Sequence, residues 1–134
     1  MHLRYALMAD HANVTQDGKL NAVGVLDRLF APRFPAVHRQ LFLVTCIETQ
    51  PQDDNMLREI RVELIDPDAK SIARVQGSIQ LGAGKQIINQ MHVFADLKFD
   101  VPGSYEFHVF CDGDEMSTLS LDLVELPPGQ TISM

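Results

Sequence analysis

The stretch SYEFHVFCDGDEMSTLSLDLVEL, residues 104–126, decides the fold of this chain. Apolar and polar residues alternate along both of its halves, and Asp112-Gly113-Asp114 separates the halves. A period of two places alternate side chains on the same face of a β-strand. Asp-Gly between two such runs is a strong signal of a hairpin. The stretch therefore predicts two antiparallel strands, each with one buried and one solvated face.

Turn signals of the same kind recur along the whole chain. Asp17-Gly18-Lys19, Asp66-Pro67-Asp68 and Pro102-Gly103 each separate two alternating runs, and no segment of useful length has the 3.6-residue period of a helix. We therefore expect an all-β fold, an antiparallel β-sandwich of about eight strands, immunoglobulin-like or C2-like, with a single domain over residues 1–134. The expected strands are residues 3–9, 20–30, 40–48, 57–66, 72–81, 87–99, 104–112 and 116–126.

Four segments carry more specific expectations. Residues 40–48 are apolar at both odd and even positions, which indicates a strand covered on both faces. Gly24, inside residues 20–30, indicates a bulge or the close approach of another group. In residues 87–99 the odd positions from Met91 to Phe99 are expected to face the core. Residues 31–39 contain two prolines and are expected to form a loop or one helical turn.

Composition bounds the compartment and the partners. Acidic residues outnumber basic ones by 18 to 11, and the net charge is −7; this balance disfavours a nucleic-acid binder, because Lys and Arg hold phosphate backbones. No run approaches the ~20 apolar residues that cross a bilayer, and the apolar N-terminal run is too short for a secretory signal. We expect a cytoplasmic protein with no membrane insertion, in which Cys46 and Cys111 are reduced thiols within strands.

The sequence lacks the motifs on which common active sites are built. It contains no Gly-x-Ser-x-Gly, no Cys-x-x-Cys and no His-x-x-x-His, and its five histidines are spread over different expected elements. Asp10-His11 resembles acid–base machinery, but no nucleophile in a recognisable setting accompanies it. We therefore expect no enzymatic activity and no cofactor.

Acidic hairpin turns suggest an alternative function. Asp66 and Asp68 lie in one turn, and Asp112 and Asp114 lie in another. Ca²⁺ takes about six to eight oxygen ligands, which such turns supply when they meet at one end of a sandwich. The simpler interpretation is that Asp and Gly are the residues that β-turns demand. The alternative is a Ca²⁺-dependent, C2-like module that binds a ligand or a lipid.

Apolar residues at outward positions suggest a different function. Six of them depart from clean alternation, and a cluster of them would mark a protein–protein contact unless loops or tails cover it. They are Phe42, Val44, Ile65, Ile88, Phe94 and Phe110. The leading expectation is a non-catalytic interaction or assembly module, either with a protein partner or as a homo-oligomer through an apolar sheet face or an edge strand.

The first third of the chain resembles an uncharacterised family of small bacterial β-sandwich proteins. The resemblance rests on residues 6–14, the Asp-Gly-Lys-Leu-Asn turn at 17–21, Gly24, and the Phe-Pro-x-x-His loop at 34–38. Residues 64–68 and 102–107 extend it over most of the chain. The resemblance implies a compact bacterial domain and no mechanism.

Loops on a rigid sandwich commonly carry binding residues, so the loops of this motif are candidates for the interaction surface. The outward phenylalanines complete the set. The candidate interaction residues are Asp10, His11, Lys19, Asn21, Phe34, His38, Phe42, Phe94 and Phe110.

Overall fold

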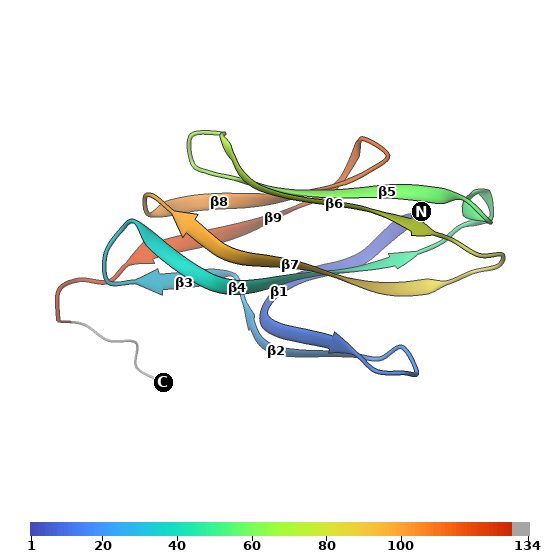
Figure 1. The fold of residues 1–134 in the computed structure, drawn as a ribbon, viewed down its shortest axis with the longest axis horizontal. Helices are drawn as coiled ribbons and strands as arrows, with labels where there is room; N and C mark the ends of the chain where they lie inside the picture. Colours follow the sequence, from blue (N-terminus) through green and yellow to red (C-terminus); the bar gives the residue numbers. More distant parts are fainter. Residues whose placement is uncertain (130–134) are drawn as a thin grey trace.

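Nine strands and one turn of 3₁₀ helix form from residues 1–129, the part of the chain that this computed structural model describes. The strands make two sheets, with the orders β2-β1-β4-β7 and β3-β9-β8-β5-β6 (Figure 1). In chain order the elements are β1 (His2–Val14), β2 (Leu20–Leu26), β3 (Arg28–Ala31), β4 (Ala36–Glu48), η1 (Pro51–Asp53), β5 (Leu57–Ile65), β6 (Ser71–Gln80), β7 (Ile87–Phe99), β8 (Gly103–Cys111) and β9 (Asp114–Glu125).

The all-β prediction is confirmed, with two corrections. Residues 20–30 were expected to form one strand, but they form β2 and β3, which belong to different sheets. β3 also pairs with β9 in parallel, so the fold is not antiparallel throughout. The chain changes sheets at Asp27, whose carbonyl accepts a hydrogen bond from the Asp122 N–H at 3.0 Å. Apolar residues continue through this crossing, so the alternation pattern gives no sign of it.

The main core lies between the two sheets, and β4 is its most buried strand. Residues 41–47 are all buried, as the apolar run at both parities predicts. Odd-numbered β4 residues such as Leu41 and Leu43 pack in the main core, whereas Phe42 and Val44 form a second apolar cluster. The main core is filled by Met8, Leu41, Leu43, Val62, Leu64, Phe94, Leu97, Phe99, Tyr105, Phe107, Val109, Leu121 and Leu123.

The expected face of β7 is wrong over the first part of the strand. Met91 and Val93 are exposed, whereas Phe94 is 3 % exposed and its ring centroid lies 5.1 Å from that of Phe107 in the core. Leu97 is buried, as expected, because the inward side changes from even to odd positions between these residues. Asp96, at the change, has a φ of 51°, a left-handed conformation that interrupts the regular pleat.

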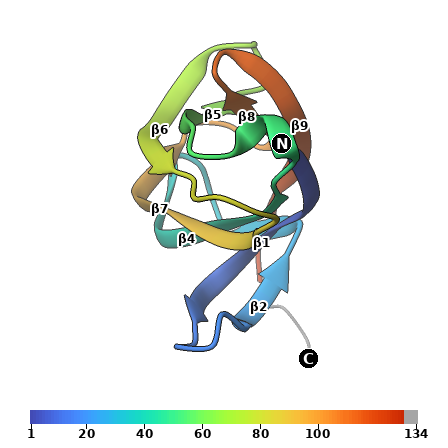
Figure 2. The same ribbon diagram turned by 90° about the vertical axis from the view of Figure 1, so that its right-hand side faces the viewer.

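The β2-β1-β4-β7 sheet is curled because β1 pairs with its two neighbours along different parts of its length. β1 pairs with β4 through residues 2–9 and with β2 through residues 8–14, and the β1–β2 hairpin turns away beneath β4 and β7 (Figure 2). Gly24 has a φ of 68°, and a Cβ there would overlap the Asp10 carboxylate. The predicted close approach at Gly24 is therefore confirmed. Asn89 on β7 donates to the Gly18 carbonyl at 3.4 Å, which holds the hairpin turn near β7.

Two other sequence features have simple structural counterparts. Cys46 on β4 and Cys111 on β8 lie in different sheets and are free thiols. Within residues 1–129 no helix has the length and apolar character needed to span a membrane.

Candidate interaction surface

The outer face of the curled sheet carries apolar residues from edge to edge. Residues that lie directly opposite each other on neighbouring strands share a face of the sheet. Val25 lies opposite Ala9, Ala9 opposite Phe42, and Phe42 opposite Val93, so one apolar row crosses all four strands. A second row, Leu7, Val44 and Met91, runs beside it over three strands. We call these two rows the apolar face.

The middle of the apolar face is covered, and its edges are open. Phe42 and Val44 are buried against Leu7, Ala12, Leu20 and Ala22, which come from the curled hairpin. The His11 ring meets the Phe42 ring edge-on, with 5.0 Å between centroids. At the two ends of the row Val25 is 61 % exposed and Val93 is 45 % exposed. The hairpin thus completes a small core and leaves apolar side chains in water at both sheet edges.

The edge strand β2 has little protection against pairing with another chain. Natural edge strands are usually short, or carry charges, prolines or inward lysines that prevent such pairing. β2, Leu20–Leu26, is seven residues long and contains no charged residue and no proline. Its Val23 is 65 % exposed. In the described part of the chain β2 pairs with β1 alone, so the backbone on its other side has no strand partner.

The outer face of the second sheet is polar. The Arg61 guanidinium lies 4.1 Å from the centroid of the Phe110 ring, and Arg61 Nε is 3.2 Å from a Glu63 carboxylate oxygen. Beside them His108 is 2.6 Å from Glu115 and 3.3 Å from Glu106. Charges on this face therefore pair with one another. The contrast makes the curled sheet the better candidate for burial against another protein.

The structure distributes the candidate interaction residues over three environments. Asp10, His11, Lys19 and Asn21 lie on the curled hairpin, and Phe42 lies beneath it. Phe110 lies on the polar face. Phe34 and Phe94 pack in the main core, and His38 on β4 has a buried Nε2 without a hydrogen-bond partner. The outward position expected for Phe94 is therefore wrong.

The sequence did not identify Val23, Val25, Met91 or Val93 as surface residues. A signal for the two β2 valines was present, because residues 20–26 contain no charge. The alternation pattern hides the edge position of β2, since it predicts a single strand over residues 20–30. For Met91 and Val93, the change of inward side along β7 has no counterpart in the sequence pattern.

The four carboxylates of the Ca²⁺ alternative lie at opposite ends of β5. The Asp66 turn follows Ile65, whose partner is Glu106, whereas the Asp112 turn follows Cys111, whose partner is Ile60. Asp66 accepts hydrogen bonds from the Asp68 and Lys70 N–H groups at 2.9 and 2.8 Å, the geometry of a turn residue. The four therefore cannot surround one ion, and residues 1–129 hold no group of three His, Cys, Asp or Glu placed for a metal.

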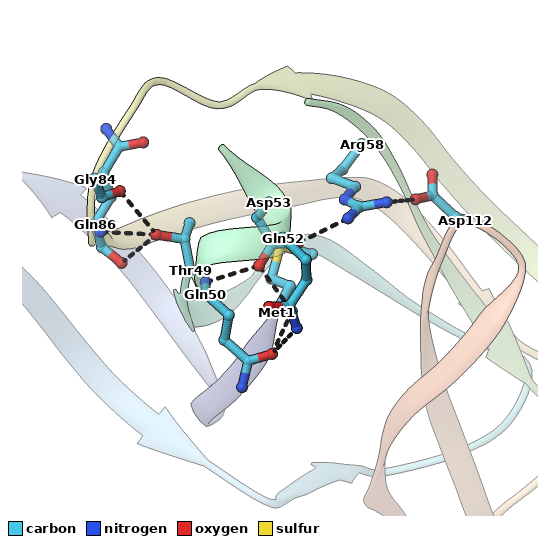
Figure 3. A network of polar contacts seen from close by, with 9 residues as sticks. All are labelled: Met1, Thr49, Gln50, Gln52, Asp53, Arg58, Gly84, Gln86 and Asp112. Atoms are coloured by element: carbon cyan, nitrogen blue, oxygen red, sulfur yellow. Dashed lines mark hydrogen bonds and ion pairs between the residues drawn. The ribbon is translucent and has the colours of Figure 1, made fainter. Parts of the chain in front are cut away.

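A buried carboxylate ties together one end of the molecule (Figure 3). Asp53 in η1 has no exposed surface, and its oxygens lie 2.8 Å from the Met1 amino group and 2.8 Å from Arg58. The Gln50 N–H donates to the same carboxylate at 2.8 Å. Burial raises the pKa of Asp53, but these donors and positive charges outweigh it and bring the pKa to about 2. Arg58 also reaches Asp112 at 3.0 Å, which joins η1 to the β8–β9 turn.

Beside this network lies a depression of about 450 Å³. Its charged groups neutralise each other in part, since Lys85 Nζ is 2.7 Å from a Glu48 carboxylate oxygen. Thr49 borders the depression and accepts a hydrogen bond from the Gln86 N–H at 2.8 Å, which fixes the 82–86 loop. The other lining residues are His2, Gln50, Pro51, Asp54 and Gly84. The contacts at this end join loops that lie far apart in the sequence.

Comparison with known proteins supports the resemblance seen in the sequence. Residues 4–124 match a family of unknown function, DUF6941. The chain belongs to this family. The match includes every motif on which the resemblance rests, from residue 6 to residue 107.

Comparisons with curated proteins and with solved structures give less information than the family match. None of the curated proteins matches this sequence. Among solved structures, the chain is similar to the Pseudomonas fluorescens alkylpurine DNA glycosylase AlkC bound to DNA containing an abasic site analog, with 14 % sequence identity and a TM-score of 0.46. The similarity covers 89 % of this chain and 30 % of the AlkC chain.

Proposed function

We propose that this protein is a non-catalytic interaction or assembly module that acts through the apolar face and the β2 edge of the curled sheet. The observation that carries the proposal is the exposure of Val23 and Val25, 65 % and 61 %, on an edge strand without charges. A seven-residue edge of this kind is a template for strand pairing. The partner is a protein surface, and a second copy of the chain is the first candidate.

The apolar character of the surface supports a protein partner. Removing apolar area from water stabilises a contact by roughly 25 cal/mol per Å², and protein interfaces have apolar centres with polar rims. Val25, Val93 and Met91 are exposed around a floor that is already packed. A net charge of −7 disfavours nucleic acid as the partner. The stricter assignment to an immunoglobulin-like or C2-like sandwich stays a prediction, as does a cytoplasmic location.

The proposal is tested by light scattering coupled to size exclusion over a wide range of protein concentrations. The wild-type chain is expected to form a dimer as concentration rises, and Val25→Lys is expected to shift it to monomer. Ser78→Lys is the matched control, because Ser78 is an exposed strand residue on the outer face of the other sheet. A wild-type chain that stays monomeric throughout, or equal effects of the two lysines, contradicts self-association through this surface.

A further inference from the structure

We propose that two copies pair through their β2 strands, antiparallel and about a two-fold axis at Val23. This inference rests on the proposed self-association and specifies its geometry. The two four-stranded sheets then join edge to edge into one sheet of eight strands. Isologous contact of one edge with itself closes the assembly at two copies.

β2 differs from the other strands that lie at sheet edges in the described residues. The edge strands are β2 and β7 in one sheet and β3 and β6 in the other. β6 and β7 contact each other, and β3 has only four residues. β2 has seven residues and lies on the hairpin that projects from the body of the molecule (Figure 2). Within residues 1–129 no strand pairs with the other side of β2.

A two-fold antiparallel pairing must place residues of the same face opposite each other. The axis therefore passes between the two copies of one β2 residue. Each choice of that residue gives one register. With the axis at Val23, the partner residues alternate correctly: Leu20 lies opposite Leu26, Asn21 opposite Val25, Ala22 opposite Gly24 and Val23 opposite Val23 of the second copy. Leu20, Ala22 and Leu26 are the half-buried residues of the strand. Leu20 and Ala22 pack against the second apolar cluster, and Leu26 packs against the main core.

Opposite charges meet at the two ends of the pairing. The same register places Lys19 opposite Asp27 of the second copy, and by symmetry this pair occurs twice. Both residues are exposed, and Lys19 Nζ also lies 3.1 Å from an Asp17 carboxylate oxygen of its own chain. An axis at Ala22 would instead oppose Asp17 and Asp27, which is a repulsion. An axis at Gly24 would oppose Leu20 and Arg28 and leave Lys19 without a carboxylate opposite it.

The backbone of β2 is irregular at Gly24. Its φ of 68° departs from the strand conformation. In the proposed register the residue opposite it is Ala22, whose side chain is a single methyl group. The smallest pair of the interface thus falls at the least regular point of the strand. Val23, the residue on the axis, is the most exposed large apolar residue of β2.

The register is tested by disulfide cross-linking. Val23→Cys, in a Cys111→Ser background so that the half-exposed native thiol is removed, is oxidised and analysed by non-reducing electrophoresis and intact-mass measurement. Directly opposed residues have Cα atoms about 4.5–5.5 Å apart, which suits a disulfide. Val25→Cys is the matched control. It would lie opposite Asn21, about 13 Å along the strand from its own symmetry mate. A covalent dimer is expected for Val23→Cys and not for Val25→Cys.

Charge reversal provides a second, independent test. Lys19→Asp is expected to weaken the dimer about tenfold, because two attractive pairs become repulsive. Lys19→Asp combined with Asp27→Lys is expected to restore most of the affinity, since the pair is rebuilt with its signs exchanged. Sedimentation equilibrium measures both dissociation constants.

The outcomes separate this inference from the proposed function. One outcome overturns the register and leaves self-association standing. In that outcome Val25→Lys disrupts the dimer, Val23→Cys gives no cross-link, and the double reversal does not restore the affinity. A chain that remains monomeric in every experiment overturns both. Cross-linking through Val23→Cys with rescue by the double reversal supports both.

Discussion

Asp53→Asn tests the claim that a buried carboxylate joins the loops at one end of the molecule. The pKa of Asp53 falls from an ordinary 3.8 to about 2 because the Met1 amino group, the Gln50 N–H and Arg58 all stabilise its charge. A shift of this size corresponds to about 2 kcal/mol of unfolding free energy at pH 7. Asn keeps the size of the side chain and removes the charge. We expect the variant to lose about 2 kcal/mol at pH 7.

The lowered pKa of Asp53 also predicts how the difference in unfolding free energy between wild type and Asp53→Asn changes with pH. A carboxyl whose pKa is lowered by folding stabilises the protein above about pH 4 and loses that effect as the pH falls toward 2. The difference between wild type and Asp53→Asn should therefore shrink to about 1 kcal/mol at pH 3 and to below about 0.5 kcal/mol at pH 2. Urea unfolding followed by circular dichroism measures the difference at each pH.

Asp100→Asn is the control for this experiment, because Asp100 is exposed and its carboxylate lies 3.7 Å from Lys98. It should change the unfolding free energy by less than about 0.5 kcal/mol at any pH. Equal losses for the two variants at pH 7 would refute the reasoning. So would a loss for Asp53→Asn that stays the same from pH 7 to pH 2.

Three further predictions concern the packing and the backbone. Phe94→Ala should cost about 3–4 kcal/mol of unfolding free energy in urea titrations, whereas Val93→Ala should cost less than about 1 kcal/mol; the reverse order would contradict the observed face of β7. Gly24→Ala should cost about 1–3 kcal/mol, and adding Asp10→Ala should recover part of the loss; no cost would show that the backbone at Gly24 can relax. Burial lowers the pKa of His92, so the unfolding free energy of the wild type should fall as the pH drops from 7.5 to 5. His92→Gln should make the unfolding free energy depend less on pH over this range. An unchanged dependence would exclude His92 as its source.

The alternation of apolar and polar residues predicts most of the strands correctly, because burial of one face of a sheet imposes a period of two. The run 57–66 differs from β5 by one residue, and 87–99 matches β7 at both ends. The doubly apolar run 40–48 gave the most buried strand for a physical reason as well. Its two faces meet different apolar clusters, and the second cluster exists because the hairpin curls over Phe42 and Val44.

The remaining features depend on contacts that a local pattern does not encode. Residues 20–30 change sheets at Asp27. Arg28 pairs in parallel with Asp122, which lies 94 positions later, and spacing along the sequence does not reveal such a partner. The change of inward side along β7 follows from the conformation of Asp96. The Asp53 network was missed because its members lie in polar loops and at the chain start, where no periodicity exists. Exposure of the β2 valines follows from sheet order, which is a property of the whole fold.

The most direct test of the β2 interaction site is hydrogen–deuterium exchange at low and high protein concentration. Pairing of β2 with a partner strand would protect those of its amide groups that no strand of the described chain covers. Exchange in residues 20–26 is expected to slow as concentration rises, while exchange in β6, an edge strand of the other sheet, stays the same. Exchange in residues 20–26 that is independent of concentration, in a sample that light scattering shows to be dimeric, would contradict the β2 edge as the site of association.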